Sequence, residues 1–228
     1  MINSIFFAPC AWFMSYHLGA WRALKESGYL VNIKSLGGVS SGALTAGSLA
    51  AGLDAQVMKD RLIKMSEVYP GILCWGKMSR IVDSSMDELL PQNINWQYHF
   101  YGVVTNFQVA LPPIGPRFIW NKSTKRDEVK NLILSSCYIP VMYEWVPKWD
   151  NKFVIDGGCF LMNLTIPNTL TISPYMEMSE NVIGYVKDSD EEKILLKNRN
   201  ASLLPNKEHL SEVYQCGYSN AQKWLANI

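Results

Sequence analysis

Apolar and polar residues alternate along the chain in two kinds of pattern. Short runs of apolar residues predict buried strands, and apolar residues spaced three or four apart predict amphipathic helices. The runs predict strands over residues 4–7, 29–36, 102–111, 116–120, 152–156 and 169–173. The spacings predict helices over residues 15–27, 41–51, 54–69, 79–90, 124–139 and 210–225. Residues 187–209 are polar and predict a surface excursion.

Strands and helices therefore alternate for most of the chain. This order predicts an α/β fold in which a sheet carries helices on both faces. The length of 228 residues suits one well-buried domain. No internal repeat or composition change divides the sequence, so we expect one domain over residues 1–228.

A G-x-S-x-G pattern, Gly38-Val39-Ser40-Ser41-Gly42, lies between a predicted strand and a predicted helix. A nucleophilic serine needs such a tight turn to expose its hydroxyl, and the turn leaves room only for glycine on either side. The helix that follows adds N–H groups and partial positive charge near the reacting oxygen. We predict Ser40 as the nucleophile and Gly38 and Gly42 as elbow glycines. Taken alone, the pentapeptide also fits a plain glycine-rich turn.

A nucleophilic serine also needs a base that accepts its proton. Histidine is the usual choice, and a Ser–Asp–His triad built from Ser40, Asp156 and His209 is one alternative. His209 follows a polar stretch and is expected to be solvated, His17 is expected in the core, and His99 has no motif around it. Asp156 is the stronger candidate, because it ends a predicted strand and precedes two glycines.

The motif Asp156-Gly157-Gly158 directs a carboxylate from a sheet edge into a cleft. An Asp-Gly pair alone is a common turn, so this interpretation depends on reading the motif together with the elbow. We predict Asp156 as the base and Gly157 and Gly158 as turn glycines.

Composition excludes several classes of function. The formal net charge is +1, which gives no electrostatic basis for nucleic-acid binding. Five cysteines without C-x-x-C spacing argue against a disulfide framework or zinc site and favour a reducing compartment. No metal or cofactor is expected. No Lys or Arg precedes the apolar residues 2–14, so we expect no signal peptide, and no apolar run is long enough to span a membrane.

These motifs together resemble the patatin-like phospholipase family, whose members pair a G-x-S-x-G serine with a D-G-G or D-G-A aspartate and use no histidine. The likeness is strongest to the animal subgroup of adipose triglyceride lipase and adiponutrin, and it covers nearly the whole chain. Further matching segments follow in the family's order: Tyr16-His17-Leu18-Gly19, Gly42-Ala43-Leu44-Thr45-Ala46, Cys137-Tyr138-Ile139-Pro140-Val141, Asn163-Leu164, Thr171-Ile172-Ser173-Pro174 and Gln215-Cys216-Gly217-Tyr218.

The resemblance implies a three-layer α/β/α fold with a mostly parallel central sheet. It also implies a mechanism in which Asp156 accepts the Ser40 proton and Ser40 forms an acyl-enzyme from a lipid ester. The activity is then a phospholipase A, an acylglycerol lipase or a transacylase.

One segment departs from the family, which has a glycine-rich oxyanion loop near its start. The expected glycines fall on Pro9, Ala11 and Met14. Proline has no N–H, and a left-handed backbone at Ala11 or Met14 costs about 1–2 kcal/mol each. Cys10 and Ala11 keep their N–H groups and are the expected oxyanion donors. The alternative is a catalytically weakened module that binds lipid or a protein partner.

The family implies a lipid ester as substrate and transient contact with a membrane or lipid-droplet surface. We therefore expect a cytoplasmic, peripherally associated protein, and residues 79–90 are a candidate interfacial helix. Dependence on a protein co-activator stays open.

Overall fold

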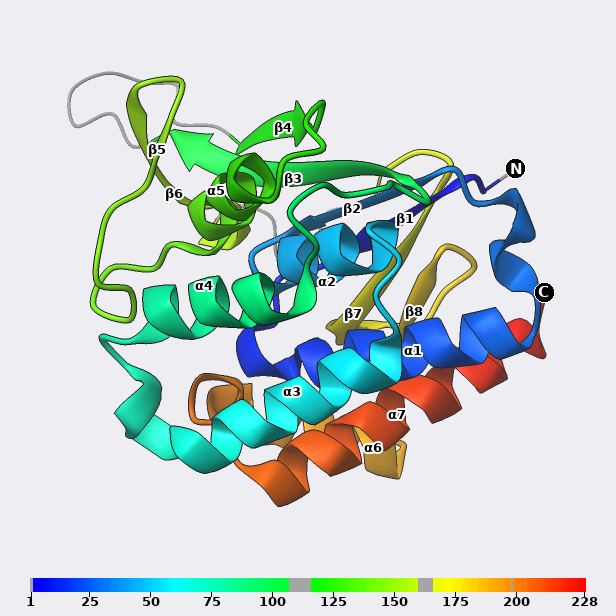
Figure 1. Cartoon of the computed structure of the whole chain (residues 1–228). Helices are drawn as coiled ribbons and strands as arrows, with labels where there is room; N and C mark the ends of the chain where they lie inside the picture. Colours follow the sequence, from blue (N-terminus) through cyan, green and yellow to red (C-terminus); the bar gives the residue numbers. More distant parts are fainter. Residues whose placement is uncertain (1, 107–115, 160–165, 198) are drawn as a thin grey trace.

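The computed structural model describes residues 2–106, 116–159, 166–197 and 199–228 (Figure 1). Its eight-stranded sheet has the order β5-β6-β3-β2-β1-β7-β8, and β4 also pairs with β3. The strands are β1 Ser4–Phe7, β2 Ser35–Val39, β3 His99–Asn106, β4 Pro116–Trp120, β5 Lys148–Trp149, β6 Lys152–Asp156, β7 Thr169–Glu177 and β8 Val182–Tyr185.

The centre of the sheet is parallel and one end is antiparallel. Strands β3, β2, β1, β7 and β8 pair in parallel, whereas β4 and β6 run antiparallel to β3 and β5 runs antiparallel to β6. Parallel strands need crossover connections, and the helices supply them. The predicted α/β class with a mostly parallel sheet is therefore confirmed.

The helices are α1 Met14–Glu26, α2 Ser41–Ala50, α3 Ala55–Val68, α4 Met78–Leu89, α5 Arg126–Cys137, α6 Asp190–Lys197 and α7 Lys207–Leu225. Short 3-10 turns complete the order: η1 Ala11–Phe13, η2 Tyr29–Asn32, η3 Gly71–Cys74, η4 Gly157–Cys159 and η5 Arg199–Leu203. Asp54 caps α3, because its side chain accepts a hydrogen bond from the Gln56 N–H.

The helices next to the central strands pack on one face of the sheet. On that face Phe7 lies against the His17 and Trp21 rings of α1, and Gly102 faces Leu132 of α5. The backbone of α2 lies directly over Gly38. Figure 1 shows α1, α3 and α7 stacked beyond α2 on the same side.

The other face carries a smaller cluster, in which Phe6, Val39, Tyr101 and Val103 are buried and Ile166 packs against them. We expected helices on both faces. Among the described residues, strand side chains and Ile166 cover this second face instead.

The segment 29–36 differs from its predicted strand. Gly28 takes a φ of 76° and ends α1, and a 3-10 turn, η2, follows before β2 begins. Strand β2 then runs through Gly37 and Gly38, past the predicted end of the strand at residue 36. Gly37 fits there because a Cβ at this position would lie 1.9 Å from the ring of Tyr101.

Other differences lie in the polar parts of the sequence. Helix α6 forms inside the predicted surface excursion, strands β5 and β8 have no sequence signal, and β7 runs past Ser173 to Glu177. Residues 107–111 of one predicted strand, and Asn163-Leu164 of the family pattern, lie outside the described residues.

Helices α1 and α7 cross at very close range. A Cβ at Gly19 would lie 2.1 Å from the Tyr214 carbonyl oxygen, and one at Gly217 would lie 2.1 Å from the Tyr16 carbonyl oxygen. Each glycine therefore admits the backbone of the opposite helix. Two segments of the family resemblance meet at this crossing.

Helix α4 does not present its apolar face to the surface. Ile81, Val82 and Met86 are buried, and the polar side is tied to α5 through Lys130, which contacts Asp83 and Asp87 at 2.8 and 2.7 Å. The predicted interfacial role of residues 79–90 therefore finds no exposed apolar face. No helix among the described residues is long and apolar enough to cross a bilayer.

Candidate active site

Ser40 occupies a strained turn between β2 and α2. Its φ of 57° and ψ of −131° are rare for a residue with a side chain. A Cβ at Gly38 would lie 2.2 Å from the Gly42 carbonyl oxygen, and one at Gly42 would lie 2.0 Å from the Phe7 carbonyl oxygen. Both glycines are therefore required where the sequence places them, and the turn has the form of a nucleophile elbow.

A residue that the sequence did not single out holds this turn. The Ser40 N–H donates to Ser136 Oγ at 3.0 Å, and the Ser136 hydroxyl donates to the Val103 carbonyl. Ser136 thus links α5, the elbow and β3. In the sequence, Ser136 lies near the end of a predicted helix, and nothing there indicates that it supports the elbow.

Asp156 is the last residue of β6 and is 3% exposed. Its Oδ1 accepts the Gly158 N–H at 2.6 Å, and its Oδ2 is buried without a hydrogen bond among the described residues. Burial raises the pKa of Asp156 to about 6, while the Ser40 hydroxyl and the Gly158 N–H oppose that rise. The two predicted residues therefore face each other, although no hydrogen bond of ordinary geometry joins them.

Neutral groups surround the carboxylate. Burial is the main cause that raises the pKa of both the Cys137 thiol and the Tyr143 hydroxyl well above their usual values, and the charge of Asp156 adds to each rise. Cys137 and Tyr143 interact with one another and line the same pocket as Ser40. Asp156 thus lies beside two buried, uncharged groups.

The two glycines after Asp156 fit tightly. A Cβ at Gly157 would lie 2.7 Å from the Val103 carbonyl oxygen. One at Gly158 would lie 2.7 Å from Pro9 Cβ and 2.9 Å from Asp156 Oδ1. The segment that departs from the family therefore packs directly against the D-G-G motif.

The candidate oxyanion segment precedes α1. The Cys10 N–H donates to Ser41 Oγ at 3.2 Å, so in this structure it is already engaged. Ala11 has a φ of 49°, whereas Met14 has an ordinary helical φ of −55°. Only Ala11 of those two adopts the left-handed backbone that a glycine in this loop would take freely.

A buried polar cluster supports this segment. The Cys10 thiol lies 3.5 Å from His17 Nε2 and 3.5 Å from Ser41 Oγ, and Thr45 Oγ1 lies 3.5 Å from His17 Nδ1. Burial lowers the pKa of His17 to about 3, so the imidazole is neutral at ordinary pH. The prediction of His17 as a core residue is confirmed.

The other two histidines lie elsewhere. His209 is packed edge-on against Phe13 at 5.2 Å, and its Nδ1 lies 3.4 Å from Glu212. Its side chain is 14% exposed, so the expectation that it is solvated was wrong. His99 is exposed at the start of β3. The contacts of His209 are thus with the helix end and Phe13, not with Ser40 or Asp156.

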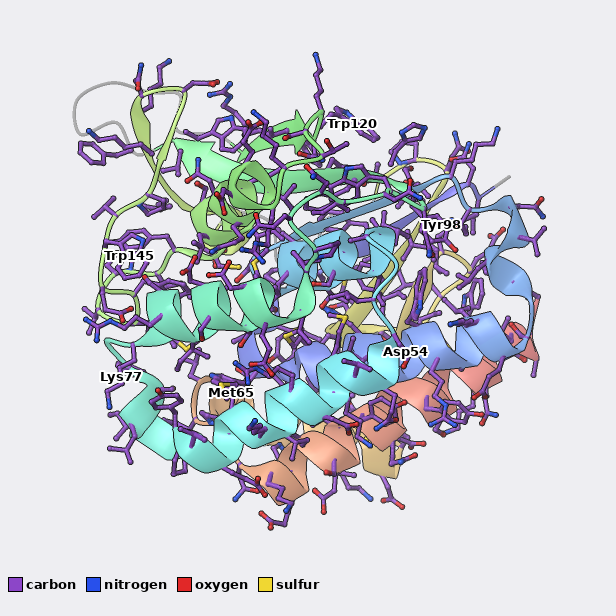
Figure 2. All side chains as sticks on the ribbon, in the orientation of Figure 1. Asp54, Met65, Lys77, Tyr98, Trp120 and Trp145 are labelled. Atoms are coloured by element: carbon purple, nitrogen blue, oxygen red, sulfur yellow. The ribbon has the colours of Figure 1, made fainter. Side chains whose placement is uncertain are left out.

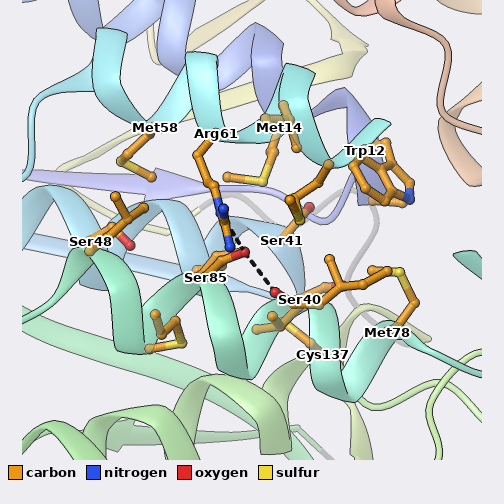
Figure 3. Close-up of a pocket in the computed structure, with 18 of the residues that line it drawn as sticks. Trp12, Met14, Ser40, Ser41, Ser48, Met58, Arg61, Met78, Ser85 and Cys137 are labelled. Atoms are coloured by element: carbon orange, nitrogen blue, oxygen red, sulfur yellow. Dashed lines mark hydrogen bonds between the residues drawn. The ribbon is translucent and has the colours of Figure 1, made fainter. Parts of the chain in front are cut away.

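Ser40 lines a mainly apolar pocket. Helices α2, α3 and α4 form its walls, and one side of α2 contributes Ser40, Leu44 and Ser48 at four-residue spacing (Figure 3). That spacing gives the pocket a length of roughly 12 Å along α2. Six methionines line it at separate points: Met14, Met58, Met65, Met78, Met86 and Met142.

The charged side chain of Arg61 also lines this pocket. Arg61 of α3 donates from Nε to Ser85 Oγ at 3.2 Å, and its Nη1 lies 2.6 Å from Glu88, both residues on α4 (Figure 3). The Arg61 side chain is 12% exposed. The spacing of apolar residues in the sequence gave no reason to place this charged side chain in the apolar pocket.

The described residues contain no cluster of three or more His, Cys, Asp or Glu side chains that could hold a metal ion. The four cysteines whose side chains are described, Cys10, Cys74, Cys137 and Cys216, are free and buried.

Known proteins match the chain in sequence. The family model of the patatin-like phospholipases matches residues 10–67, which contain the elbow. Human patatin-like phospholipase domain-containing protein 4 is 26% identical over 248 aligned positions, which cover 96% of this chain and 94% of that protein. The mouse 1-acylglycerol-3-phosphate O-acyltransferase Pnpla3 is 25% identical over 75% of this chain, but the match spans only 43% of that longer protein.

Solved structures match in fold. VipD from Legionella pneumophila aligns with a TM-score of 0.59 and 12% identity, over 99% of this chain and 67% of that chain. The type III effector ExoU aligns with a TM-score of 0.52 and 13% identity, over 99% of this chain and 53% of that chain. Taken together, the comparisons show that the chain is similar in sequence to patatin-like phospholipases and shares its fold with VipD and ExoU.

Proposed function

We propose that this chain is a lipid acyl hydrolase, a phospholipase A or an acylglycerol lipase, that works through a Ser40–Asp156 dyad. The observation that carries the proposal is the pairing of a strained, pocket-lining serine with a buried carboxylate whose Oδ2 has no partner among the described residues. A pKa near 6 suits Asp156 to proton transfer at neutral pH better than an ordinary aspartate.

The reaction follows from these positions. Asp156 accepts the hydroxyl proton as Ser40 Oγ attacks the ester carbonyl, and the tetrahedral intermediate collapses with cleavage of the bond to the alcohol. The leaving alkoxide takes the proton from Asp156. Water, or another hydroxyl as acceptor, then releases the acyl group by the reverse sequence.

Oxyanion stabilisation would come from the starts of two helices. Ala11 and Ser41 are the first residues of η1 and α2, and first-turn N–H groups have no partner inside their own helix. The α2 dipole adds positive charge at the same point. The Cys10 N–H is less suited, since it already donates to Ser41 Oγ.

The pocket supports a lipid substrate. Its walls are mainly aliphatic and methionine side chains, and flexible thioethers adapt to chains of differing shape. An acyl chain attached to Ser40 would lie along α2 past Leu44 towards Ser48. A free hydroxyl acceptor in place of water would make the same site a transacylase.

A fluorophosphonate probe tests the proposal, because it reacts only with an activated serine. We expect labelling of the wild type and loss of both labelling and ester cleavage in Ser40→Ala. Ser48→Ala, which changes another buried serine of the same pocket, should keep both. Unchanged cleavage by Ser40→Ala would end the proposal. A lipid panel then separates phospholipid from acylglycerol and hydrolysis from transfer.

The second candidate is a catalytically weakened module that binds lipid or a protein partner. The engaged Cys10 N–H and the strained Ala11 favour it, since loss of one oxyanion donor lowers turnover by about 10²–10³. It predicts lipid binding without probe labelling in the wild type. Glycine at positions 9, 11 and 14 should then restore ester cleavage.

A further inference from the structure

Exposed apolar side chains gather at one end of the molecule. Thirteen large apolar residues are exposed in the described part of the chain, and six of them lie on three neighbouring loops. We name these six the docking rim: Ile72, Leu73, Val141, Trp145, Val146 and Leu204.

Hydrogen bonds hold the three loops together. The Met78 N–H donates to the Met142 carbonyl at 3.2 Å, and the Gly71 N–H donates to the Pro205 carbonyl at 3.0 Å. Ser79 and Glu144 bond each other twice, backbone to side chain in both directions. Figure 2 shows Lys77 and Trp145 projecting at the same edge of the molecule. The rim is therefore one surface built from loops far apart in sequence.

Two of the loops that carry the rim also contribute residues to the pocket lining. Met142, the neighbour of Val141, lines the pocket, and so does Met78, which ends the loop that carries Ile72 and Leu73. Apolar surface thus continues from outside the molecule to the cavity that contains Ser40.

Val141 adds a backbone observation. It is 76% exposed and has a φ of 74°, a strained conformation for a β-branched residue. Strain at an exposed apolar residue contributes nothing to the core. Such outliers are often kept for a function.

We propose that the docking rim inserts into a lipid surface and feeds single lipid molecules into the pocket. The lipid partner rests on the proposed function, because the rim continues into the pocket proposed for the acyl chain. Charge agrees with this partner: Lys77 and Arg80, which is 79% exposed and paired with Glu144 at 3.3 Å, flank the rim, and basic side chains beside apolar ones suit the headgroup layer.

The experiment compares binding to phosphatidylcholine vesicles with cleavage of a water-soluble short-chain ester. The test variant is Ile72→Ser/Leu73→Ser, which changes two exposed residues outside the pocket lining. We expect about tenfold weaker vesicle binding or more, slower cleavage of vesicle lipid, and unchanged cleavage of the soluble ester. Val141→Ser/Val146→Ser repeats the test on a second loop.

The control is Val31→Ser. Val31 is 85% exposed in η2, which packs near the C-terminal end of α7 through the contact of Tyr29 with Trp224. Figure 1 places that end of the chain opposite the loop between α3 and α4. Val31→Ser should bind vesicles like the wild type.

Two outcomes would overturn the proposal. One is wild-type vesicle binding by both rim variants. The other is a loss that occurs in Trp120→Ser but not in the rim variants, since Trp120 is exposed on β4 at a separate aromatic patch. If the wild type binds vesicles through the rim but cleaves no ester, the docking surface stands and the proposed function fails.

Discussion

Backbone strain at two residues of the candidate site has different consequences. Ser40 and Ala11 both have positive φ without being glycine. At Ser40 the strain exposes the hydroxyl, and no other residue type would serve. At Ala11 the proposed chemistry uses only the backbone N–H, so the methyl group adds backbone strain without contributing to the reaction.

We predict that Ala11→Gly raises the free energy of unfolding by about 0.5–1 kcal/mol. Glycine removes a left-handed penalty of about 1–2 kcal/mol and adds a somewhat smaller entropic cost in the unfolded chain. The N–H at position 11 stays in place, so ester cleavage should not fall. Denaturant titration and turnover on a soluble ester measure the two quantities.

Met14→Gly is the matched comparison. Met14 is helical and 6% exposed, so the same change there should lower stability by about 2 kcal/mol or more. Equal losses at both positions would show that the φ of Ala11 is not strained in solution.

The crossing of α1 and α7 sets the distance between two whole elements. Gly19 and Gly217 face opposite backbones rather than side chains, and backbone cannot move aside. We predict that Gly217→Ala lowers the free energy of unfolding by about 3 kcal/mol or more, because the added methyl forces the helices apart.

Thermal unfolding of Gly217→Ala beside Gln222→Ala checks this. Gln222 is exposed on the same helix, and its change to alanine should shift stability by less than about 0.5 kcal/mol. A small loss in Gly217→Ala would mean that the crossing is looser than the coordinates indicate.

Elements with strong local patterns were predictable from the sequence. Strand β6 and the start of α3 were placed well, because a short apolar run and an Asp cap are local signals. Helix α6 was missed since its apolar residues, such as Leu195, are few among charged ones. Strand β8 was missed because its burial depends on β7 beside it, a contact that no local pattern encodes.

Under the proposed mechanism, Asp156 links the stability of the whole molecule to ester cleavage. Burial raises the pKa of Asp156 from 3.8 to about 6, so the folded protein holds this proton more tightly than the unfolded chain. A raised acid pKa makes stability fall as pH rises from about 4 to above 6, by on the order of 3 kcal/mol from this one group. The active carboxylate forms over the same range.

We therefore predict opposite pH trends for the wild type. Ester cleavage should rise through an apparent pKa near 6, while the free energy of unfolding decreases over the same interval. Asp156→Asn should remove most of that decrease, be more stable than the wild type at neutral pH, and lose cleavage. Denaturant titrations across pH provide the stability data. A less stable Asp156→Asn would contradict the account.

At this scale the sequence placed the two residues of the proposed dyad near each other but did not predict their surroundings. Ser40 and Asp156 carried motif signals, and the structure brings them face to face. Ser136 and Arg61 carried none, because their roles exist only after α5 meets the elbow and α3 meets α4. The engagement of the Cys10 N–H likewise depends on a side chain that is distant in sequence.

Helices α3 and α4 form one uninterrupted insertion between α2 and β3 and contain no strand of the sheet. This insertion supplies a large part of the pocket wall, whereas the proposed dyad lies at the turn between β2 and α2 and at the end of β6. Under the proposed function, replacement of these two helices alone would change which fatty tails fit, while Ser40 and Asp156 keep their positions.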